Sequence, residues 1–386
     1  MKKNAQKTLD LGFWDKAKKA AAKEKRPILV LAPMADVTDA AFRRIIAKYS
    51  RMGQPHGGPD VMWTEFVSAD GLCSPGRKVL LNDLIYTEGE RPIVAQLFTS
   101  NPAKMRVAAE LVAKLGFDGL DINMGCPDRS IEKQKSGAAM MKDPENAIAV
   151  IEAAREGVEM GRQAGTSFGG LPGEPSGRVL GMGNPGIARR KIVPAGLPFI
   201  PVSVKTRIGY NKVEIDTWIR ALLEQKLPVL TVHLRTRKEM SDMPAHWELM
   251  PEIVKLRDEI SPKTLIIGNG DALSLADAKE KAEKSGCDGI MLGRAIFGNP
   301  WLFDSKIKRS KEGKIKDEEK NEIKKRLRVL VEHTDLFMEL FGDIKSFAVM
   351  KKHYKAYVNG WDGAKFLRAK LMETKDASEV KSTVDK

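Results

Sequence analysis

The chain has 386 residues, of which 42% are hydrophobic, and it carries a formal net charge of +14. This length exceeds one average domain and suits one large barrel with an appendage. The positive charge favours a polyanionic partner, either nucleic acid or an anionic membrane surface, although a basic protein without such a partner can have the same charge.

The three cysteines, Cys73, Cys126 and Cys287, form no CxxC pair, which argues against a disulfide framework or a zinc site. They favour a reducing compartment. Residues 1–26 are rich in Lys and Ala and lack the apolar core of a secretory signal. No run of about 18 apolar residues predicts a membrane span. We therefore expect a cytoplasmic protein without metal ligands, monomeric by default and without an obligate protein partner.

A short amphipathic helix is predicted over residues 9–22, with Leu11, Phe13 and Trp14 as docking points. Beyond it, apolar runs alternate with stretches of helical periodicity. The predicted strands cover residues 28–32, 61–66, 93–98, 119–122, 201–206, 229–234, 264–268 and 290–292. The predicted helices cover residues 39–50, 101–115, 144–155, 213–224, 248–259 and 274–284, with a short one opening at 295–297. Thr38 is expected to cap the first of these helices.

Eight strands alternating with helices predict an α/β fold, an eight-stranded (β/α)8 barrel, which typically runs ~250 residues. The alternative is a doubly wound open sheet. Such a sheet would carry a Gly-rich phosphate turn after its first strand, where this chain has Pro33-Met34-Ala35.

Three regions are predicted: an N-terminal helical extension over residues 1–26, a barrel over residues 27–303, and a helical domain over residues 304–386 that is basic on its outer face. Residues 157–199 are dense in Gly and Pro and are predicted as an insertion between a helix and the fifth strand. Such a loop lies on the barrel face opposite the active site, so we expect no catalytic role for it. The last residues, 374–386, are expected to be frayed.

Chemically distinctive residues recur at the carboxyl ends of the predicted strands, where active sites of such barrels lie. They are Pro33, Met34, Ala35, Gln96, Asn123, Cys126, Lys205, Arg207, His233, Asn269, Gly270, Asp271, Gly293 and Arg294. Each has a simpler explanation when taken alone: Cys126 as a small buried hydrophobe, Lys205 as an ion-pair partner, His233 as a core histidine. Their recurrence at one end of successive strands favours a shared site.

The last two strands suggest a ligand that carries phosphate. The loops at Asn269 to Asp271 and at Gly293-Arg294 would bring backbone N–H groups, a guanidinium and a helix N-terminus close to an anion. These loops form the usual phosphate site of such barrels. Lys205 and Gln96, placed deeper, suit a polar ring such as the pyrimidine edge of a flavin. The spacing does not itself distinguish a flavin from a sugar phosphate.

In this order along the chain, the residues resemble the tRNA-dihydrouridine synthase family. The resemblance covers nearly the whole barrel. It is carried by Ala32-Pro33-Met34-Ala35 with Thr38-Asp39, Ala95-Gln96-Leu97, Asn123-Met124-Gly125-Cys126-Pro127, Gly137-Ala138-Ala139-Met140, Val204-Lys205-Thr206-Arg207, Val232-His233 with Arg235-Thr236-Arg237, Asn269-Gly270-Asp271 and Gly293-Arg294-Ala295. Lys352-His353-Tyr354 and Gly363-Ala364 extend it into the carboxyl-terminal segment.

The resemblance implies an FMN-dependent oxidoreductase that uses NADPH to reduce the C5–C6 double bond of a uridine in tRNA. It implies that hydride passes from the flavin to C6 and that Cys126 donates the proton to C5. A thiol with its ordinary pKa of about 8.5 is mostly protonated at neutral pH and can do this. The implied FMN contacts are Pro33, Met34, Ala35, Gln96, Lys205, His233, Asn269, Gly270, Asp271, Gly293 and Arg294.

Candidates for substrate contacts follow from the same resemblance. Asn123 and Arg207 are candidates for holding the base or its developing charge, and Arg235 is a further one. In the helical domain, Lys352 and His353 are two further candidates for substrate contacts. They belong to a larger basic group that is expected to contact phosphates of the tRNA. The group consists of Lys351, Lys352, His353, Lys355, Lys365, Arg368 and Lys370.

The chain departs from the family pattern beyond the sixth strand. Leu234 follows His233 where the family commonly has Gly, and residues 240–245 differ from its usual Tyr-Gly pattern. These departures concern the substrate loop rather than the flavin site. Two other functions stay open: an FMN-dependent dehydrogenase of a free pyrimidine, and a basic RNA-binding module with an inactive barrel.

Overall fold

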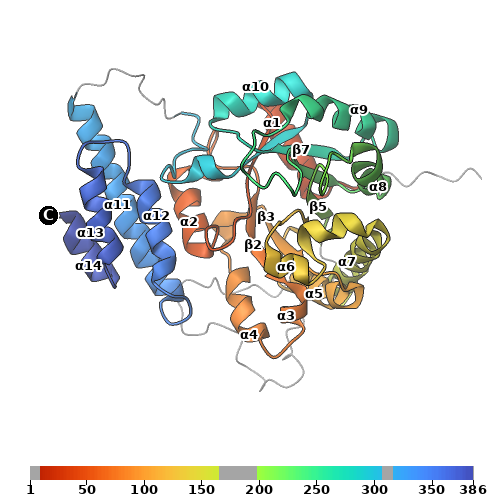
Figure 1. Cartoon of the computed structure of the whole chain (residues 1–386), viewed down its shortest axis with the longest axis horizontal. Coiled ribbons are helices and arrows are strands. Elements are labelled where there is room, and N and C mark those ends of the chain that lie inside the picture. Colours follow the sequence, from red (N-terminus) through yellow and green to blue (C-terminus); the bar gives the residue numbers. More distant parts are fainter. Residues whose placement is uncertain (1–8, 165–197, 307–315, 386) are drawn as a thin grey trace, which may run out of the picture.

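Eight parallel strands form a closed barrel in the computed structural model, which describes residues 9–164, 198–306 and 316–385. The strand order is β1-β8-β7-β6-β5-β4-β3-β2. A parallel bridge between Val30 and Val61 joins the first and last strands of this order and closes the ring. Helices surround the barrel, and the carboxyl-terminal helices lie to one side of it (Figure 1). The predicted (β/α)8 barrel is therefore confirmed.

Every predicted strand is present within two residues of its expected bounds. The strands are β1 (Ile28–Leu31), β2 (Met62–Ser68), β3 (Ile93–Phe98), β4 (Gly119–Met124), β5 (Val202–Arg207), β6 (Val229–His233), β7 (Leu265–Asn269) and β8 (Gly289–Leu292). Short apolar runs predict these strands well, because strands of a parallel barrel are covered on both faces and are therefore apolar along most of their length.

The helices include several that sequence periodicity does not predict. The α-helices are α1 (Phe13–Lys23), α2 (Ala40–Tyr49), α3 (Ala69–Leu72), α4 (Arg77–Leu80), α5 (Pro102–Lys114), α6 (Arg129–Lys133), α7 (Pro144–Ala164), α8 (Arg220–Glu224), α9 (Met250–Ile260), α10 (Leu275–Ser285), α11 (Lys316–Phe341), α12 (Ala348–Tyr357), α13 (Ala364–Glu373) and α14 (Ala377–Asp385). Shorter helical turns are η1 (Leu81–Leu84), η2 (Glu88–Glu90), η3 (Gly137–Lys142), η4 (Ile215–Ile219), η5 (Trp247–Leu249) and η6 (Arg294–Ile296). The unpredicted α3, α4 and α6 belong to the loops that follow β2 and β4, at the carboxyl end of the barrel.

Two expectations about individual helices are wrong. Asp39, not Thr38, caps α2, because its carboxylate accepts a hydrogen bond of 2.8 Å from the Phe42 N–H. Thr38 instead bonds both backbone groups of Met34 and shapes the loop after β1. Residues 374–386, expected to be frayed, contain α14, whose Val380 is fully buried in the core of the helical region.

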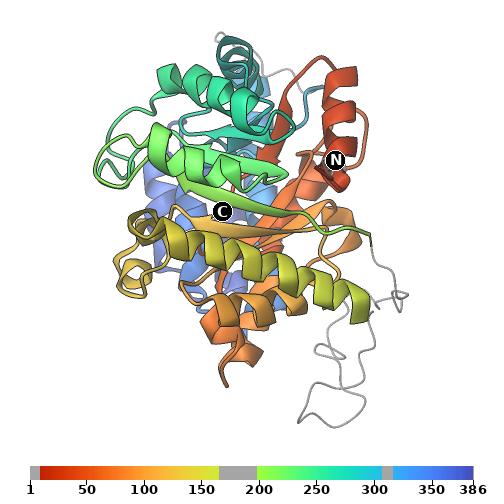
Figure 2. The same cartoon turned by 90° about the vertical axis from the view of Figure 1, so that its right-hand side faces the viewer.

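The helix before the predicted insertion is longer than expected. Gly157 and Gly161, taken as signs of a loop, lie within α7 and face α5, so that a Cβ at Gly157 would lie 2.1 Å from the Arg106 carbonyl oxygen. These glycines allow α7 to lie closely along α5 (Figure 2). Residues 157–164 are therefore helical, and residues 165–197 of the predicted insertion lie outside the described residues.

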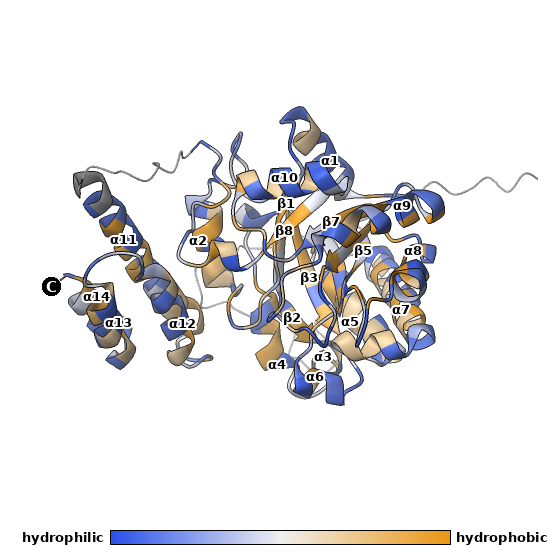
Figure 3. Cartoon of the chain, turned by 45° about the horizontal axis from the view of Figure 1, so that its top comes forward, coloured by the Kyte–Doolittle hydropathy of each residue, from blue (hydrophilic) through white to orange (hydrophobic). Residues whose placement is uncertain are grey.

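Side chains alternate between two clusters along the strands, as the pleat requires. Leu29 and Leu31 of β1 pack outward under the helices in the larger cluster, whereas Ile28 and Val30 point inward. Trp14 from α1 packs against Trp63 in the inner cluster, with ring centroids 5.7 Å apart. Apolar residues concentrate on the strands and hydrophilic ones on the outer helix faces (Figure 3). None of the described helices is both long and apolar enough to cross a bilayer.

The carboxyl-terminal helices share a core with α2 of the barrel. Ala40, Ala41 and Ile45 of α2 are buried in one cluster with Phe337 and Tyr354 of the helical region. At the loop between α11 and α12, Lys345 forms ion pairs with two acidic groups of the barrel. The helical region is thus held to the barrel by one apolar seam and one group of charges.

Candidate active site

The strand register brings the predicted residues together at the carboxyl end of the barrel. Asn123 of β4 pairs with Lys205 of β5, Arg207 pairs with His233 of β6, and His233 pairs with Asn269 of β7. Side chains two residues apart on a strand point to the same face. His233 and Asn269 therefore point into the barrel, as the interior residues Val229 and Leu265 of the same strands do, and the paired residues of β4 and β5 share this face. Recurrence of polar residues at these positions therefore corresponds to one ring of neighbouring side chains.

The loops that follow β1, β7 and β8 also approach this ring of side chains. Met34 in the loop after β1 lies beside Gly293, where an added Cβ would be 3.6 Å from the Met34 sulfur. Gly270, which has a φ of +124°, lies against the His233 ring at 3.3 Å from an added Cβ. The predicted residues of the β1, β7 and β8 loops thus belong to the same end of the barrel as Lys205 and His233.

Cys126 lies on a loop that the chain itself holds in shape. The Asn123 side-chain oxygen accepts hydrogen bonds from the Gly125 N–H at 3.1 Å and the Cys126 N–H at 2.9 Å. The Cys126 carbonyl in turn accepts a bond of 2.9 Å from the Ala138 N–H. Gly137, with φ +61°, is required there because a Cβ would lie 2.7 Å from the Cys126 carbonyl oxygen.

Burial raises the pKa of the Cys126 thiol, and the positive charges of Lys205 and Arg207 offset only part of this effect. The thiol is therefore protonated at neutral pH. A protonated thiol beside a ring of polar groups can serve as a proton donor, whereas a nucleophilic cysteine would need a depressed pKa.

Lys205 is the residue of the site that most clearly indicates a bound ligand. Burial and the nearby positive charge of Arg207 together lower its pKa to about 8. Within the parts of the chain that the structure describes, its ammonium group makes no hydrogen bond or ion pair. Because a desolvated ammonium without an acceptor is costly, an acceptor-rich ligand at this position would relieve it.

Arg207 is largely occupied by backbone carbonyls. Its Nε donates to the Gly125 carbonyl at 2.9 Å, and its Nη1 donates to those of Thr236 at 3.0 Å and Met240 at 2.7 Å. Burial lowers its pKa to about 10. Arg207 thereby ties the Cys126 loop to the loop after β6, which assigns it a positioning role beside its predicted contact with substrate.

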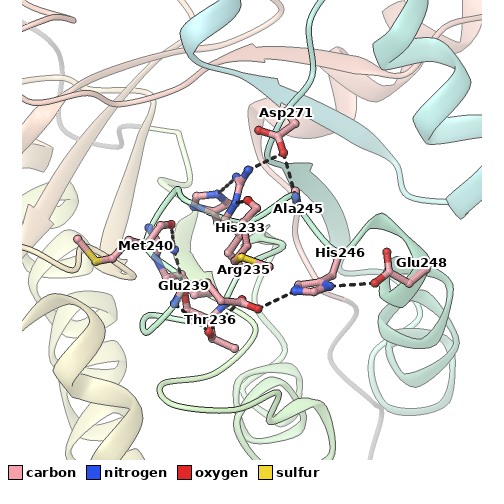
Figure 4. Close-up of polar contacts among 11 residues, drawn as sticks. His233, Arg235, Thr236, Glu239, Met240, Ala245, His246, Glu248 and Asp271 are labelled. Carbon is pink, nitrogen blue, oxygen red and sulfur yellow. Dashed lines mark hydrogen bonds and ion pairs between the residues drawn. The ribbon is translucent and has the colours of Figure 1, made fainter.

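A second network surrounds His233 (Figure 4). Arg235 Nη1 lies 3.0 Å from His233 Nε2, and since a guanidinium only donates, this nitrogen accepts and Nδ1 carries the proton. Burial holds the pKa of His233 well below its ordinary value, so the ring is neutral. Asp271 accepts from Arg235 at 2.5 Å and from Arg294 at 2.6 Å. Asp271 thus orients two guanidinium groups, and His233 keeps an N–H to offer.

The loop after β6, which departs from the family pattern, is cross-linked by polar contacts of its own. His246 lies between Glu239 and Glu248, at 2.8 and 2.9 Å, and these hydrogen bonds raise its pKa. Glu239 also accepts from the Thr236 N–H at 2.7 Å (Figure 4). A cavity of about 500 Å³ beside this loop is lined in part by Lys212. The loop is therefore an ordered wall next to the site.

Asp121 is a residue of the site that sequence reasoning missed. It lies two positions before Asn123 on β4, so it has the same inward parity, and it is fully buried. Its carboxylate accepts hydrogen bonds from Gln96 Nε2 at 2.6 Å and from Ser203 Oγ at 2.5 Å. The sequence contains an indication of this role, because Asp121 is a carboxylate within an apolar strand and such groups are almost never buried without partners.

The structure separates Lys352 and His353 of the predicted basic group. Lys352 is exposed and lies 3.4 Å from Asp36 of the β1 loop. His353 is 1% exposed and packs against Phe42, with ring centroids 5.4 Å apart. The His353 ring thus forms part of the seam between α12 and α2, and it is not exposed for the predicted contact with substrate.

The buried histidines predict an acid-sensitive helical region. Burial lowers the pKa of His333 to about 3 and that of its neighbour His353 well below its ordinary value. Both rings are neutral in the folded protein, whereas in the unfolded chain they become protonated below about pH 6.5. The folded state is therefore favoured fully above about pH 6.5, and this contribution to the free energy of unfolding is lost as the pH falls. From the His333 shift, we expect a loss of about 3 kcal/mol between pH 7 and 4.5 in urea unfolding.

The control for this effect is the variant His333→Phe, which keeps an apolar ring at the buried position. Other groups also destabilise proteins in acid, so the informative quantity is the difference between variant and wild type. The variant should lose less stability between the two pH values. An equal loss in both proteins would show that His333 is not the source.

The fold is a closed (β/α)8 barrel whose carboxyl end carries a protonated thiol, a neutral imidazole and a lysine that has no hydrogen-bond partner among the described residues. The chain matches the family model described as dihydrouridine synthase over residues 30–167 and 190–386, and it belongs to that family. The unmatched residues 168–189 fall within the predicted insertion.

Two relatives illustrate the extent of this similarity. A protein named "Probable tRNA-dihydrouridine synthase" from Staphylococcus aureus strain MRSA252 is 36% identical, over 93% of this chain and 93% of that protein. A "Probable tRNA-dihydrouridine synthase 2" from Bacillus subtilis strain 168 is also 36% identical, over 93% of this chain and 94% of that protein. Among solved structures, a morphinone reductase in complex with tetrahydroNAD is similar over 71% of this chain and 85% of that chain, at a TM-score of 0.41 and 10% identity. That likeness is too weak to assign a cofactor.

Proposed function

We propose that this chain reduces uridines in tRNA to 5,6-dihydrouridine, with FMN as cofactor and NADPH as reductant. Membership of the dihydrouridine synthase family and the names of its full-length relatives support the reaction. The observation that carries the proposal at the level of residues is the protonated Cys126 thiol, held on a shaped loop beside Lys205.

The polar groups at the strand tips fit a flavin. Lys205 has no partner among the described residues, His233 has an uncommitted Nδ1–H, and Gln96 uses only one of its two Nε2 hydrogens on Asp121. These donors suit the acceptor-rich pyrimidine edge, and the β7 and β8 loops suit the phosphate. The residues proposed to hold FMN are Pro33, Met34, Ala35, Gln96, Lys205, His233, Asn269, Gly270, Asp271, Gly293 and Arg294.

The bound flavin supplies the hydride chemistry, and the chain supplies the acid and the orientation. Cys126 donates its proton to C5 of the uracil that receives hydride at C6. Asn123 holds the loop that carries the thiol, and Arg207 links this loop to the loop after β6. Arg235 acts through His233 and Asp271 rather than as a free cation.

A target uridine must leave its stack, which costs a few kcal/mol. Phosphate contacts from exposed cations can offset this cost. Lys352 belongs to this group and lies where α12 meets the β1 loop. Lys355, Lys365 and Lys370 are exposed on the same helical region.

The function is tested with purified protein in two steps. An absorbance scan is expected to show the two visible bands of an oxidised flavin, which NADPH should bleach. Addition of unmodified tRNA, but not of free uracil, should restore the bands and produce dihydrouridine. Reoxidation by free uracil would favour the pyrimidine dehydrogenase, and RNA binding by a colourless protein that FMN does not reconstitute would favour the RNA-binding module.

A further inference from the structure

Below the mouth of the barrel, four buried polar side chains form a continuous chain of hydrogen bonds that ends at the Cys126 loop. We infer that Asp121 is a positioning residue for the proton transfer, acting on Cys126 through Gln96 and Asn123. This inference rests on the proposed function for the identity of the reaction but not for the geometry.

The chain of bonds begins deep in the barrel and runs outward. Ser203 Oγ and Gln96 Nε2 donate to the two oxygens of Asp121, at 2.5 and 2.6 Å. Asn123 Nδ2 donates to Gln96 Oε1 at 3.1 Å. Asn123 Oδ1 then accepts from the N–H groups of Gly125 and Cys126. All the side chains in this relay are buried, and Asp121 and Gln96 are fully so.

The carboxylate gives this relay a single direction. Burial raises the pKa of Asp121 to about 6, so at neutral pH the group is ionised and only accepts hydrogen bonds. Gln96 must then turn its NH₂ toward Asp121 and its oxygen toward Asn123. Asn123 must in turn present its own oxygen to the Cys126 loop. If both amides were reversed, the Asn123 NH₂ would face two backbone donors.

The position of the thiol depends on that last step. Asn123 Oδ1 closes the turn at Gly125 and Cys126, and the rest of the loop is fixed by Arg207 and by the Ala138 N–H. The buried Asp121 charge, four residues before Gly125, therefore selects the loop conformation without direct contact with the loop. Charge-assisted hydrogen bonds are roughly twice as strong as neutral ones, which suits an anchor.

The variant Asp121→Asn tests this role. Its neutral amide can face Gln96 with either its oxygen or its NH₂, so the relay loses its single direction. Gln96 is itself a proposed FMN contact, but Lys205, His233 and the β7 and β8 loops are unchanged in this variant. Most of the flavin content and of the NADPH-driven reduction is therefore expected to remain, and reoxidation is the half-reaction expected to slow most. Reoxidation by tRNA should slow at least about 10-fold with KM for tRNA unchanged, because misplacement by an ångström can cost about 100-fold. The rate at which iodoacetamide alkylates Cys126 should also change.

The matched control is Thr231→Val. Thr231 is a fully buried polar residue of the barrel interior, and its hydroxyl has no hydrogen-bond partner among the described residues. Thr231→Val should behave as wild type in all four measurements. If Asp121→Asn does not fold, Ser203→Ala weakens the anchor from its other side and should change tRNA-driven reoxidation and alkylation in the same direction.

Three results would overturn the inference. The first is an Asp121→Asn protein with wild-type reoxidation and alkylation. The second is a variant that loses flavin or slows NADPH-driven reduction as much as reoxidation, because Asp121 would then belong to the flavin site. The third is an equal change in Thr231→Val. Failure of the proposed function is distinguishable, since wild-type protein would then make no dihydrouridine while the alkylation comparison still tests the relay.

Discussion

The variant Cys126→Ala is expected to form dihydrouridine about 100- to 10,000-fold more slowly than the wild type, since this is the typical contribution of a positioned general acid. Flavin binding and NADPH-driven reduction should be unchanged, because Cys126 lies on a loop whose shape depends on its backbone N–H and carbonyl rather than on its sulfur. Stopped-flow absorbance separates the two half-reactions: reduction by NADPH, then reoxidation by unmodified tRNA.

Two other cysteines provide the matched controls. Cys73 lies just after α3, where its sulfur bonds the Lys104 carbonyl, and Cys287 lies just before β8, at the opposite end of the barrel. Ala substitutions of Cys73 and Cys287 should leave both half-reactions intact. If Cys126→Ala slowed reduction and reoxidation together, the residue would be structural, and another group would have to supply the proton.

Sequence reasoning reached the barrel and most of the site because both depend on short-range patterns. Apolar runs between helical stretches mark strands that are covered on both faces. The inward parity of Asn123, Lys205 and His233 follows from the pleat once the strands are known. The register then places them beside one another, as the pairs Asn123–Lys205 and His233–Asn269 illustrate.

The features that sequence reasoning missed depend on contacts between distant segments. Gly157 and Gly161 suggest a loop when taken alone, yet they allow α7 to approach α5. His353 suggests a surface cation, yet α2 covers it. The mode of action of Arg207 is set by carbonyls that come together only after folding. A residue type states what a side chain can bond, and the tertiary fold decides which partner it meets.

The seam between barrel and helical region supplies the second large effect, a loss of stability in Lys345→Met. Lys345 Nζ lies 3.0 Å from Glu65 in β2 and 2.7 Å from Asp83 in η1, and its side chain is only 18% exposed. Removal of the ammonium leaves two carboxylates without their cation. Breaking a fully buried pair costs about 3–5 kcal/mol, so about 2–3 kcal/mol is expected for this partly exposed group in urea unfolding.

The pH dependence of this loss identifies its source. Burial raises the pKa of Glu65 to about 7 even though Lys345 lowers it, so the variant should raise this pKa further. Below pH 7 the carboxyl is protonated in both proteins, and little of the Glu65 contribution is lost. Above pH 7 only the wild type keeps a paired carboxylate, so the stability difference should grow as pH rises. Measurements at pH 6 and 8.5 bracket the change.

The comparison variant is Lys352→Met, the same substitution in the same helical region. Its ion pair with Asp36 spans 3.4 Å between side chains that are 39% and 65% exposed, so its loss should cost about 0–1 kcal/mol at either pH. An equally small cost for Lys345→Met would mean that the apolar contacts of α2 with α11 and α12 hold the seam alone. A larger cost that grows above pH 7 would show that Lys345 contributes to the docking of the helical region. A higher KM for tRNA in Lys345→Met, with unchanged flavin reduction, would connect that docking to substrate binding.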